Sequence, residues 1–224
     1  MKVCCLIPAY NEVRTIGAVI RGCRPHLVDI VVVDDGSTDG TPDAARGAGA
    51  HLLRHEKNSG KGTALKTGFS FALREGFDAV LSIDADGQHD PEEIPKFLDA
   101  YKAAGGDIII GARLWDRKEI PLQRYISNMV GVFFISLAAG QKIPDTQSGF
   151  RLYGKEVLEG IEFGSKGFEA ETEILIKAGR AGFRIGALPV KAIYPEKHNS
   201  HFRAVRDFTR ISLTVLKTIY GGVR

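Results

Sequence analysis

Through the first half of the chain, short apolar runs alternate with longer segments in which apolar residues recur every three or four positions. Four of the five runs are continuous rather than alternating, which is typical of strands covered on both faces. The predicted strands lie at residues 2–8, 29–35, 50–55, 78–84 and 107–113, and the predicted helices between them at about 12–24, 41–47, 61–75 and 91–103. This alternation predicts an α/β fold with a mostly parallel central sheet, helices on both faces and right-handed crossovers.

The alternation stops after residue 113. The expected elements are then a partly amphipathic helix near 119–139, a loop over 140–154, a helix around 169–181, a strand over 183–194 and a basic, apolar helix at about 203–220. No linker, low-complexity stretch or repeat divides the sequence. We therefore expect one domain over residues 1–224 with a variable second half.

The composition is ordinary for a soluble globular protein, with 44% hydrophobic and 25% charged residues. A net charge of +3 is too small to indicate nucleic-acid binding. Basic residues are frequent in the C-terminal quarter, where they form either a solvated face or a contact to phosphates on a ligand or membrane. Three cysteines, two of them adjacent, make no disulfide framework and favour a reduced, cytoplasmic setting.

No apolar run in the sequence indicates a membrane-inserted segment. The apolar run at the N-terminus is too short for a signal peptide. The longest mostly apolar stretch, residues 129–140, is shorter than the ~20 residues of a membrane-spanning helix. We expect any membrane contact to be peripheral, or to be made by a separate anchoring partner.

Polar segments directly follow three of the predicted strands. They are PAYNE (8–12), DDGSTDG (34–40) and DADGQHD (84–90). Ligands of open α/β sheets bind outside the carboxyl ends of the strands. The three segments should therefore meet at one edge of the sheet and form a ligand site there.

Two aspartates in the third segment, Asp84 and Asp86, are separated by one residue. On an extended backbone both side chains project to the same side, so that their oxygens can share one hard cation. Gln88 adds a neutral oxygen, and such donors suit Mg²⁺ or Mn²⁺, which take further ligands from water and substrate phosphates. His89 is not expected to be a ligand, because the oxygen donors suffice.

Two prolines mark expected helix starts. Asp90 precedes Pro91 and Thr41 precedes Pro42, as an N-cap precedes proline at the first helical position. We therefore assign Asp90 to a helix cap rather than to the cation site.

The second polar segment indicates a nucleoside. A carboxylate of Asp34 or Asp35 at a strand end can accept from a ribose hydroxyl or a base N–H, and with a cation nearby the ligand becomes a nucleoside diphosphate. Residues 58–68 do not form a phosphate loop, because Gly62 follows Lys61 and position 55 is histidine. The G-x-G-x-x-G pattern is also absent from the first strand–helix turn. These absences argue against a kinase-like NTPase and a Rossmann dehydrogenase.

Six motifs occur along the chain in this order: LIPAYNE, VVVDDGSTDGT, GKGTALKTGF, DADGQHDPEEIP, GAR and DTQSGFRL. In this order they resemble the family 2 glycosyltransferases, which have the GT-A fold. With FEAETEIL they are most similar to the dolichyl- and polyprenyl-phosphate sugar synthases. The resemblance covers nearly the whole chain and implies metal-dependent, inverting transfer of a sugar from a nucleotide-sugar. Residues 1–113 would form the nucleotide-sugar and metal half, and residues 114–224 the acceptor half.

The resemblance also implies roles for individual residues. The base would contact Pro8, Tyr10 and Glu12, and the nucleoside Asp35. The donor would further contact Asp84, Ala85, Asp86 and Arg113, while Asp86 and Gln88 would hold the metal. The catalytic set would be Asp84, Asp86, Arg113 and Arg124, and the acceptor set Arg124, Asp145, Arg151 and Glu171.

The residues leave the acceptor open. A phosphate acceptor is ionised near pH 7 and needs no general base, whereas a sugar hydroxyl needs one. Asp145, Glu169 and Glu171 are the available carboxylates, and each could equally pair with an arginine or cap a helix. The leading hypothesis is transfer of mannose or glucose from a GDP- or UDP-sugar to a polyprenyl or dolichyl phosphate. The alternatives are transfer to a hydroxyl in polysaccharide or glycolipid synthesis, and a non-catalytic nucleotide-sugar-binding subunit.

The expected partners follow from the leading hypothesis. They are a nucleotide-sugar and a lipid phosphate at the membrane surface, and they do not include nucleic acid. The expected location is the cytoplasm, with peripheral attachment to the cytoplasmic face of the membrane. Residues 119–139 and the C-terminal helix have the basic and apolar character of interfacial helices, although packing on the sheet explains their apolar faces as well.

Overall fold

The computed structural model describes residues 1–104, 107–113, 122–191 and 193. In this part of the chain, seven strands form one sheet in the order β3-β2-β1-β4-β6-β5-β7. The strands are β1 (Val3–Ala9), β2 (Ile30–Asp34), β3 (His51–Arg54), β4 (Ala79–Ser82), β5 (Ile108–Arg113), β6 (Arg151–Gly154) and β7 (Ile185–Val190). Among these strands β6 alone is antiparallel to its neighbours, β4 and β5. The predicted α/β fold with a mostly parallel sheet is confirmed.

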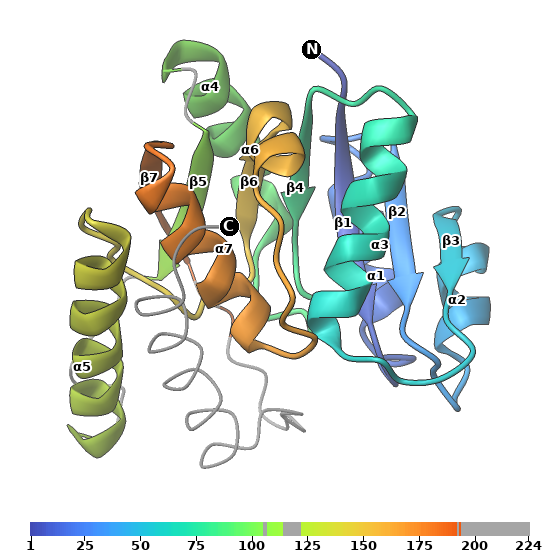
Figure 1. Cartoon of the computed structure of the whole chain (residues 1–224). Helices are drawn as coiled ribbons and strands as arrows, with labels where there is room; N and C mark the ends of the chain where they lie inside the picture. Colours follow the sequence, from blue (N-terminus) through green and yellow to red (C-terminus); the bar gives the residue numbers. More distant parts are fainter. Residues whose placement is uncertain (105–106, 114–121, 192, 194–224) are drawn as a thin grey trace.

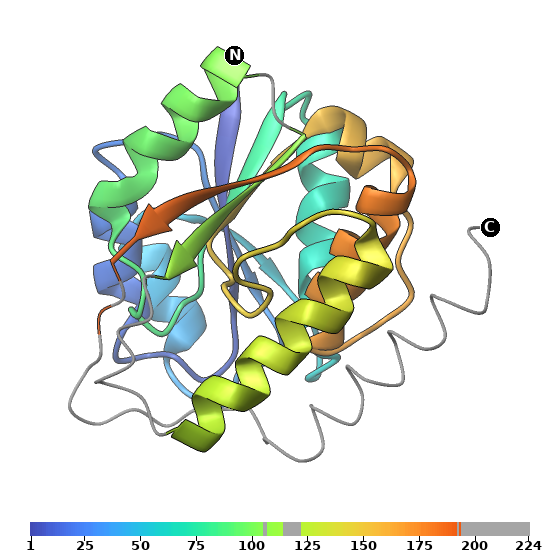
Figure 2. The same cartoon turned by 90° about the vertical axis from the view of Figure 1, so that its left-hand side faces the viewer.

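Helices cover both faces of the sheet (Figures 1 and 2). The helical elements are α1 (Ile16–Cys23), α2 (Thr41–Gly47), α3 (Lys61–Arg74), the 3-10 helix η1 (Pro91–Glu93), α4 (Ile94–Ala104), α5 (Leu122–Ala139), α6 (Lys155–Gly160) and α7 (Glu169–Arg180). One core cluster joins the sheet to α3, α5, α6 and α7, and a second joins it to α1, α2 and α4.

The continuous apolar runs serve both core clusters. In β1, Cys4 and Leu6 pack in the first cluster, and Cys5 and Ile7 in the second. Because successive side chains of a strand point to opposite faces, a strand covered on both sides must be apolar at every position. This explains why the continuous runs located β1, β2, β4 and β5.

Two short elements were missed. The expected loop over 140–154 contains β6 at its end, and α6 follows directly. The four residues of β6 begin with Arg151, which masks the apolar signal of a central strand. The strand predicted at 183–194 is shorter, since β7 covers Ile185–Val190.

The predicted helix starts are partly correct. Asp90 caps η1, with its Oδ1 accepting from Glu92 N at 3.1 Å. Thr41 is not an N-cap, because it is the first residue of α2 and Gly40 is the cap. Asp39 instead accepts from Thr41 N at 2.9 Å. The first helix was predicted too long and begins at Ile16. The helix expected at about 203–220 lies outside the described residues.

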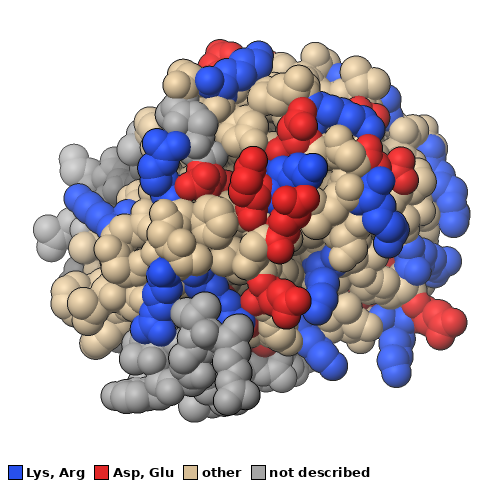
Figure 3. All heavy atoms as spheres, turned by 45° about the horizontal axis from the view of Figure 1, so that its top comes forward, with Lys and Arg blue, Asp and Glu red and all other residues tan. Residues whose placement is uncertain are grey.

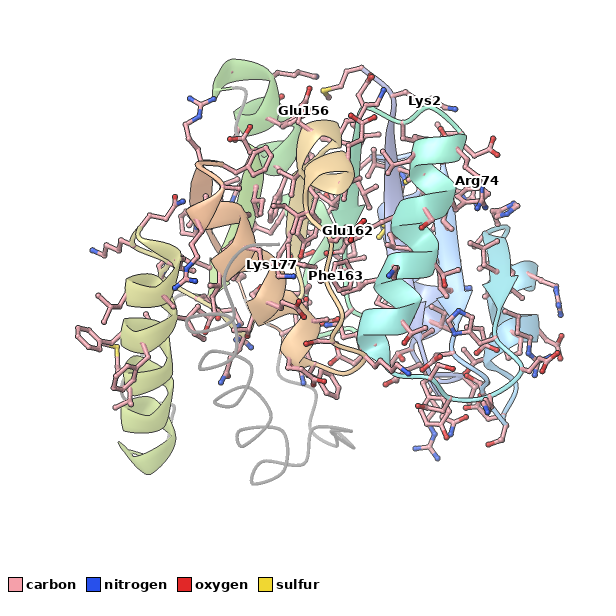
Figure 4. The ribbon with its side chains drawn as sticks, in the orientation of Figure 1. Lys2, Arg74, Glu156, Glu162, Phe163 and Lys177 are labelled. Carbon is pink, nitrogen blue, oxygen red and sulfur yellow. The ribbon has the colours of Figure 1, made fainter. Side chains whose placement is uncertain are left out.

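The segment between α6 and α7 positions the start of α3. Phe163 packs edge-on against Phe69 of α3, with ring centroids 6.2 Å apart, and Lys177 of α7 donates to Glu162 O at 2.8 Å (Figure 4). Further along this segment, Lys166 O accepts from Gly62 N at 2.7 Å. These contacts place the first residue of α3, Lys61, at the edge where the parallel strands end.

Candidate active site

The carboxyl ends of the parallel strands meet at the lower edge in Figure 1. Because β6 runs in the opposite direction, the loop that precedes it, residues 145–149, lies at this same edge. The three polar segments predicted from the sequence are therefore joined by a fourth from the second half of the chain. We call this set of loops the strand-end edge.

The first two polar segments are tied to each other through Asn11. Its φ of 55° is left-handed, a conformation that asparagine tolerates better than most residues. Asn11 N donates to Ser37 Oγ at 2.9 Å, and Asn11 Oδ1 accepts from Thr38 N at 2.9 Å. Of the predicted base contacts, Tyr10 and Glu12 flank Asn11, and Pro8 lies three residues before it. Asn11 was missed because its role depends on a backbone angle.

Asp35, the predicted nucleoside contact, organises the next loop. Its Oδ1 accepts from Ser59 N at 3.0 Å and its Oδ2 from Gly60 N at 2.7 Å. His55 Nδ1 lies 2.7 Å from Oδ1, and only 3% of Asp35 is exposed. The carboxylate thus faces the loop that leads into α3 and holds it in place.

Lys61 forms ion pairs with two carboxylates. Its Nζ lies 2.6 Å from Asp84 Oδ1 and 2.8 Å from Glu171 Oε2. Burial disfavours the ammonium, but the two carboxylates outweigh this effect and raise the pKa of Lys61. Burial likewise opposes ionisation of Asp84, yet the ammonium of Lys61 holds its pKa below the ordinary value. This role of Lys61 was not predicted, because its two partners lie far from it along the chain.

Gly149 lies against Asp84. A Cβ on Gly149 would overlap both carboxylate oxygens of Asp84. The Asp84 side chain as a whole remains 26% exposed. The loop before β6 therefore forms one wall of the space in which the Asp84 carboxylate sits.

Arg113 and Asp145 form a bidentate pair. Arg113 Nε donates to Asp145 Oδ2 at 2.8 Å, and Nη2 donates to Oδ1 at 3.1 Å. Burial would raise the pKa of Asp145, but the hydrogen bonds and charge of Arg113 lower it. The structure thus joins a predicted donor residue to a predicted acceptor residue.

Arg151 is fully buried. Its guanidinium donates to three backbone carbonyls, those of Ser148 at 2.7 Å, Thr146 at 2.9 Å and Glu171 at 2.9 Å. These bonds hold the loop before β6 against the start of α7. Acceptor contact had been expected of Arg151, but its donors face the scaffold rather than open space. The Arg124 side chain lies outside the described residues, although its backbone is in the first turn of α5.

The backbone between Asp84 and Gln88 is not extended. The strand β4 ends at Ser82, residues 85–86 form a turn, and Gly87 has a φ of 75°. The expectation that Asp84 and Asp86 project side by side from an extended strand is therefore wrong. Asp84 faces Lys61, whereas Asp86 Oδ1 accepts from Gln88 N at 3.0 Å. Ala85 between them is buried.

The donor set still suits a hard cation. Asp86 and Gln88 offer oxygens of the kind that Mg²⁺ and Mn²⁺ prefer, from one tight turn. Among the described residues, no group of three or more histidines, cysteines or carboxylates could hold a metal by itself. A cation at this turn would therefore need ligands from water and from a substrate diphosphate. His89 is 4% exposed, and burial lowers its pKa to about 4, which leaves the imidazole neutral at pH 7.

The opposite edge, where the parallel strands begin, is different in character. Acidic side chains gather there with basic ones around them (Figure 3). Asp78 Oδ2 accepts from Lys2 N at 2.6 Å, and Lys155 pairs with Glu159 at 3.6 Å, all at exposed positions. Such exposed pairs are typical of a solvated surface. The partly buried ion pairs at the strand-end edge are thus the ones that indicate a site.

Comparison with known proteins decides the family. The model of glycosyl transferase family 2 matches residues 4–161, which include all three polar segments and Lys61. This chain belongs to glycosyltransferase family 2. The resemblance noted in the sequence is confirmed.

Relatives of this glycosyltransferase include enzymes named for lipid phosphates. An undecaprenyl-phosphate mannosyltransferase from Micrococcus luteus is 31% identical over 209 residues, which cover 88% of this chain and 85% of the relative. A UDP-N-acetylglucosamine–dolichyl-phosphate N-acetylglucosaminyltransferase from Methanococcus voltae is 32% identical over 214 residues, with 85% of each chain covered.

A solved structure supports the fold. Glucosyl-3-phosphoglycerate synthase from Mycobacterium tuberculosis, in complex with Mn²⁺, UDP and phosphoglyceric acid, has a TM-score of 0.75 and 22% identity. The match covers 98% of this glycosyltransferase and 78% of that chain. The expected GT-A fold is thereby confirmed.

Proposed function

We propose that this glycosyltransferase moves a sugar, mannose or glucose, with inversion from a GDP- or UDP-sugar to a polyprenyl or dolichyl phosphate. One observation carries the choice of acceptor. Two of the three carboxylates that could serve as a base for a hydroxyl acceptor are paired with cations, and the third accepts a backbone hydrogen bond through one of its oxygens.

The three candidate bases have different partners. Asp145 is held by Arg113, Glu171 by Lys61, and Glu169 Oε1 accepts from Gly167 N at 3.2 Å. A carboxylate whose pKa is lowered, as that of Asp145 is, accepts a proton poorly at pH 7. A phosphate acceptor is already ionised there and needs no base. The names of the lipid-phosphate relatives support the same acceptor.

The proposed donor site lies in the first half of the chain. Pro8, Tyr10 and Glu12 contact the base near the junction with Asn11, and Asp35 supports the nucleoside through the loop it holds. Asp84 and Ala85 contact the sugar and diphosphate, and Asp86 and Gln88 hold Mg²⁺ or Mn²⁺. When bound, the cation stabilises charge that develops on the leaving diphosphate. Arg113 and Arg124 bind phosphate groups of donor and acceptor, which adds positive charge at the same place.

The acceptor is tested with purified protein, GDP- and UDP-sugars, Mg²⁺ or Mn²⁺, and either a short-chain polyprenyl phosphate or the matching polyprenol. We expect the wild-type protein, in which Arg113 pairs with Asp145 and Lys61 with Glu171, to transfer the sugar to the phosphate and not to the alcohol. Transfer to a sugar hydroxyl at a comparable rate would contradict the proposal. Donor binding without turnover in any combination would instead indicate a non-catalytic subunit.

We further propose that α5 lies on the membrane surface where the lipid acceptor resides. Its outer side carries five exposed apolar side chains on successive turns, and its inner side packs on α7. These are Met129 (52% exposed), Val130 (44%), Phe133 (63%), Phe134 (53%) and Leu137 (69%). Among the described helices none is long and apolar enough to cross a membrane. Such a stripe suits an interfacial helix.

Vesicle sedimentation tests the α5 stripe. Replacing both Phe133 and Phe134 by serine should weaken binding to anionic phospholipid vesicles at least about tenfold. The variant lacks the two rings that the wild type would transfer from water into the membrane interface. Val28→Ser is the matched control, since Val28 is 82% exposed and lies far along the chain from α5. Equal binding by the double variant and the control would rule out α5 as the contact.

A further inference from the structure

The ammonium of Lys61 links parts of the chain that are distant in sequence. Its partners are Asp84, after β4, and Glu171, in the first turn of α7. Lys61 itself is held by the segment before α7, since Gly62 N donates to Lys166 O. The φ of 98° at Gly60 lets the chain enter α3 at this close approach. The position of the ammonium is therefore determined from three sides.

The positive charge of Lys61 affects whether Asp84 can join Asp86 in binding a cation. Asp84 and Asp86 are separated by one residue, so that their backbones lie within about 7 Å of each other. A divalent cation bound at Asp86 would attract the carboxylate of Asp84 if that carboxylate carried an uncompensated charge. In this structure the charge of Asp84 is compensated by Lys61 at 2.6 Å.

Two further contacts restrain the Asp84 carboxylate. Gly149 closes one side of it, where even a methyl group would overlap the oxygens. Glu171, which is only 6% exposed, pairs with the Lys61 ammonium at 2.8 Å and so holds Lys61 beside Asp84. Asp84 itself lies at the strand-end edge, directly after β4, and its side chain is 26% exposed.

We propose that Lys61 is a positioning residue that keeps Asp84 out of the metal coordination and holds it for the donor sugar. The inference rests on the proposed donor and metal sites. It divides the two aspartates between two tasks: Asp86 binds the cation, and Asp84, paired with Lys61, orients a sugar hydroxyl. Glu171 is then the anchor that prevents Lys61 from moving toward the diphosphate.

Mn²⁺ binding without nucleotide provides the test. In Lys61→Met the charge of Asp84 is uncompensated, so we expect Mn²⁺ to bind at least about threefold more tightly, while donor turnover falls. A merely structural role of Lys61 would weaken or leave unchanged the binding of Mn²⁺. Adding Asp84→Asn to Lys61→Met should return the Mn²⁺ affinity to the wild-type value.

A charge-balanced variant covers the case in which Lys61→Met fails to fold. The double variant Lys61→Met/Glu171→Gln has the net charge of the wild type but still frees Asp84, and it should bind Mn²⁺ more tightly than the wild type. Glu171→Gln alone keeps the pair of Lys61 and Asp84 and should not tighten binding. Unchanged or weaker Mn²⁺ binding by the double variant would overturn the inference. If the wild type neither binds Mn²⁺ nor turns over any donor, the proposed function itself is wrong.

Discussion

Asp86→Ala is expected to lower sugar transfer at least about 1,000-fold, because a metal ion supplies several kcal/mol of transition-state stabilisation. Asp86 provides the only carboxylate of the proposed metal pair, and Gln88 alone is a neutral, weak ligand. Initial rates over a titration of Mg²⁺ and Mn²⁺ would measure the effect. Raising the metal concentration should restore only part of the rate.

The matched control for this variant lies in the same segment. Asp90→Ala removes the cap of η1 and should cost about 1 kcal/mol of folding free energy while transfer persists. If Asp86→Ala and Asp90→Ala retain the same rate, the turn at residues 84–88 is not the metal site.

Gly149→Ala is expected to reduce turnover at least about 100-fold, since a displacement of reacting groups by ~1 Å has costs of this order. The new methyl group would occupy the position of the Asp84 carboxylate, which must then move away from Lys61. The Asp84 carboxylate would no longer point where the donor sugar is proposed to lie. The effect should appear in kcat, with the protein still folded as judged by circular dichroism.

The control for Gly149→Ala is Gly47→Ala at the end of α2. A Cβ at Gly47 meets nothing within 4 Å, so this change should leave transfer unaffected. A folded Gly149→Ala variant with the wild-type kcat would show that the contact with Asp84 is not needed for turnover.

The sequence predicted the sheet because four of its strands, β1, β2, β4 and β5, are largely buried on both faces. Continuous apolar runs such as that of β1 are visible without any knowledge of their neighbours. β6 was missed because Arg151 stands in its first position, and that arginine is tolerated only because three backbone carbonyls accept its hydrogen bonds. Those carbonyls come from segments whose positions the sequence does not reveal.

The sequence predicted which residue types lie at the candidate site better than it predicted their contacts with one another. The polar segments were expected at one edge because parallel strands end together, and they lie there. The contacts of Lys61 with Asp84 and Glu171 join residues far apart along the chain, so no local pattern encodes them. The turn at Ala85 and Asp86 likewise depends on the positive φ of Gly87. The prediction of an extended backbone for this segment did not take that glycine into account.

The reversed strand also has a consequence for dissection of the molecule. β6 lies between β4 and β5, so β5 is connected to the rest of the sheet only through a strand that follows it by nearly forty residues. A fragment cut after Arg113 would retain every residue of the proposed donor site, yet its last strand would have lost both hydrogen-bonding neighbours. The proposed boundary between donor and acceptor halves is therefore not a boundary between folding units, and the two halves must be expressed and exchanged between homologues as one piece.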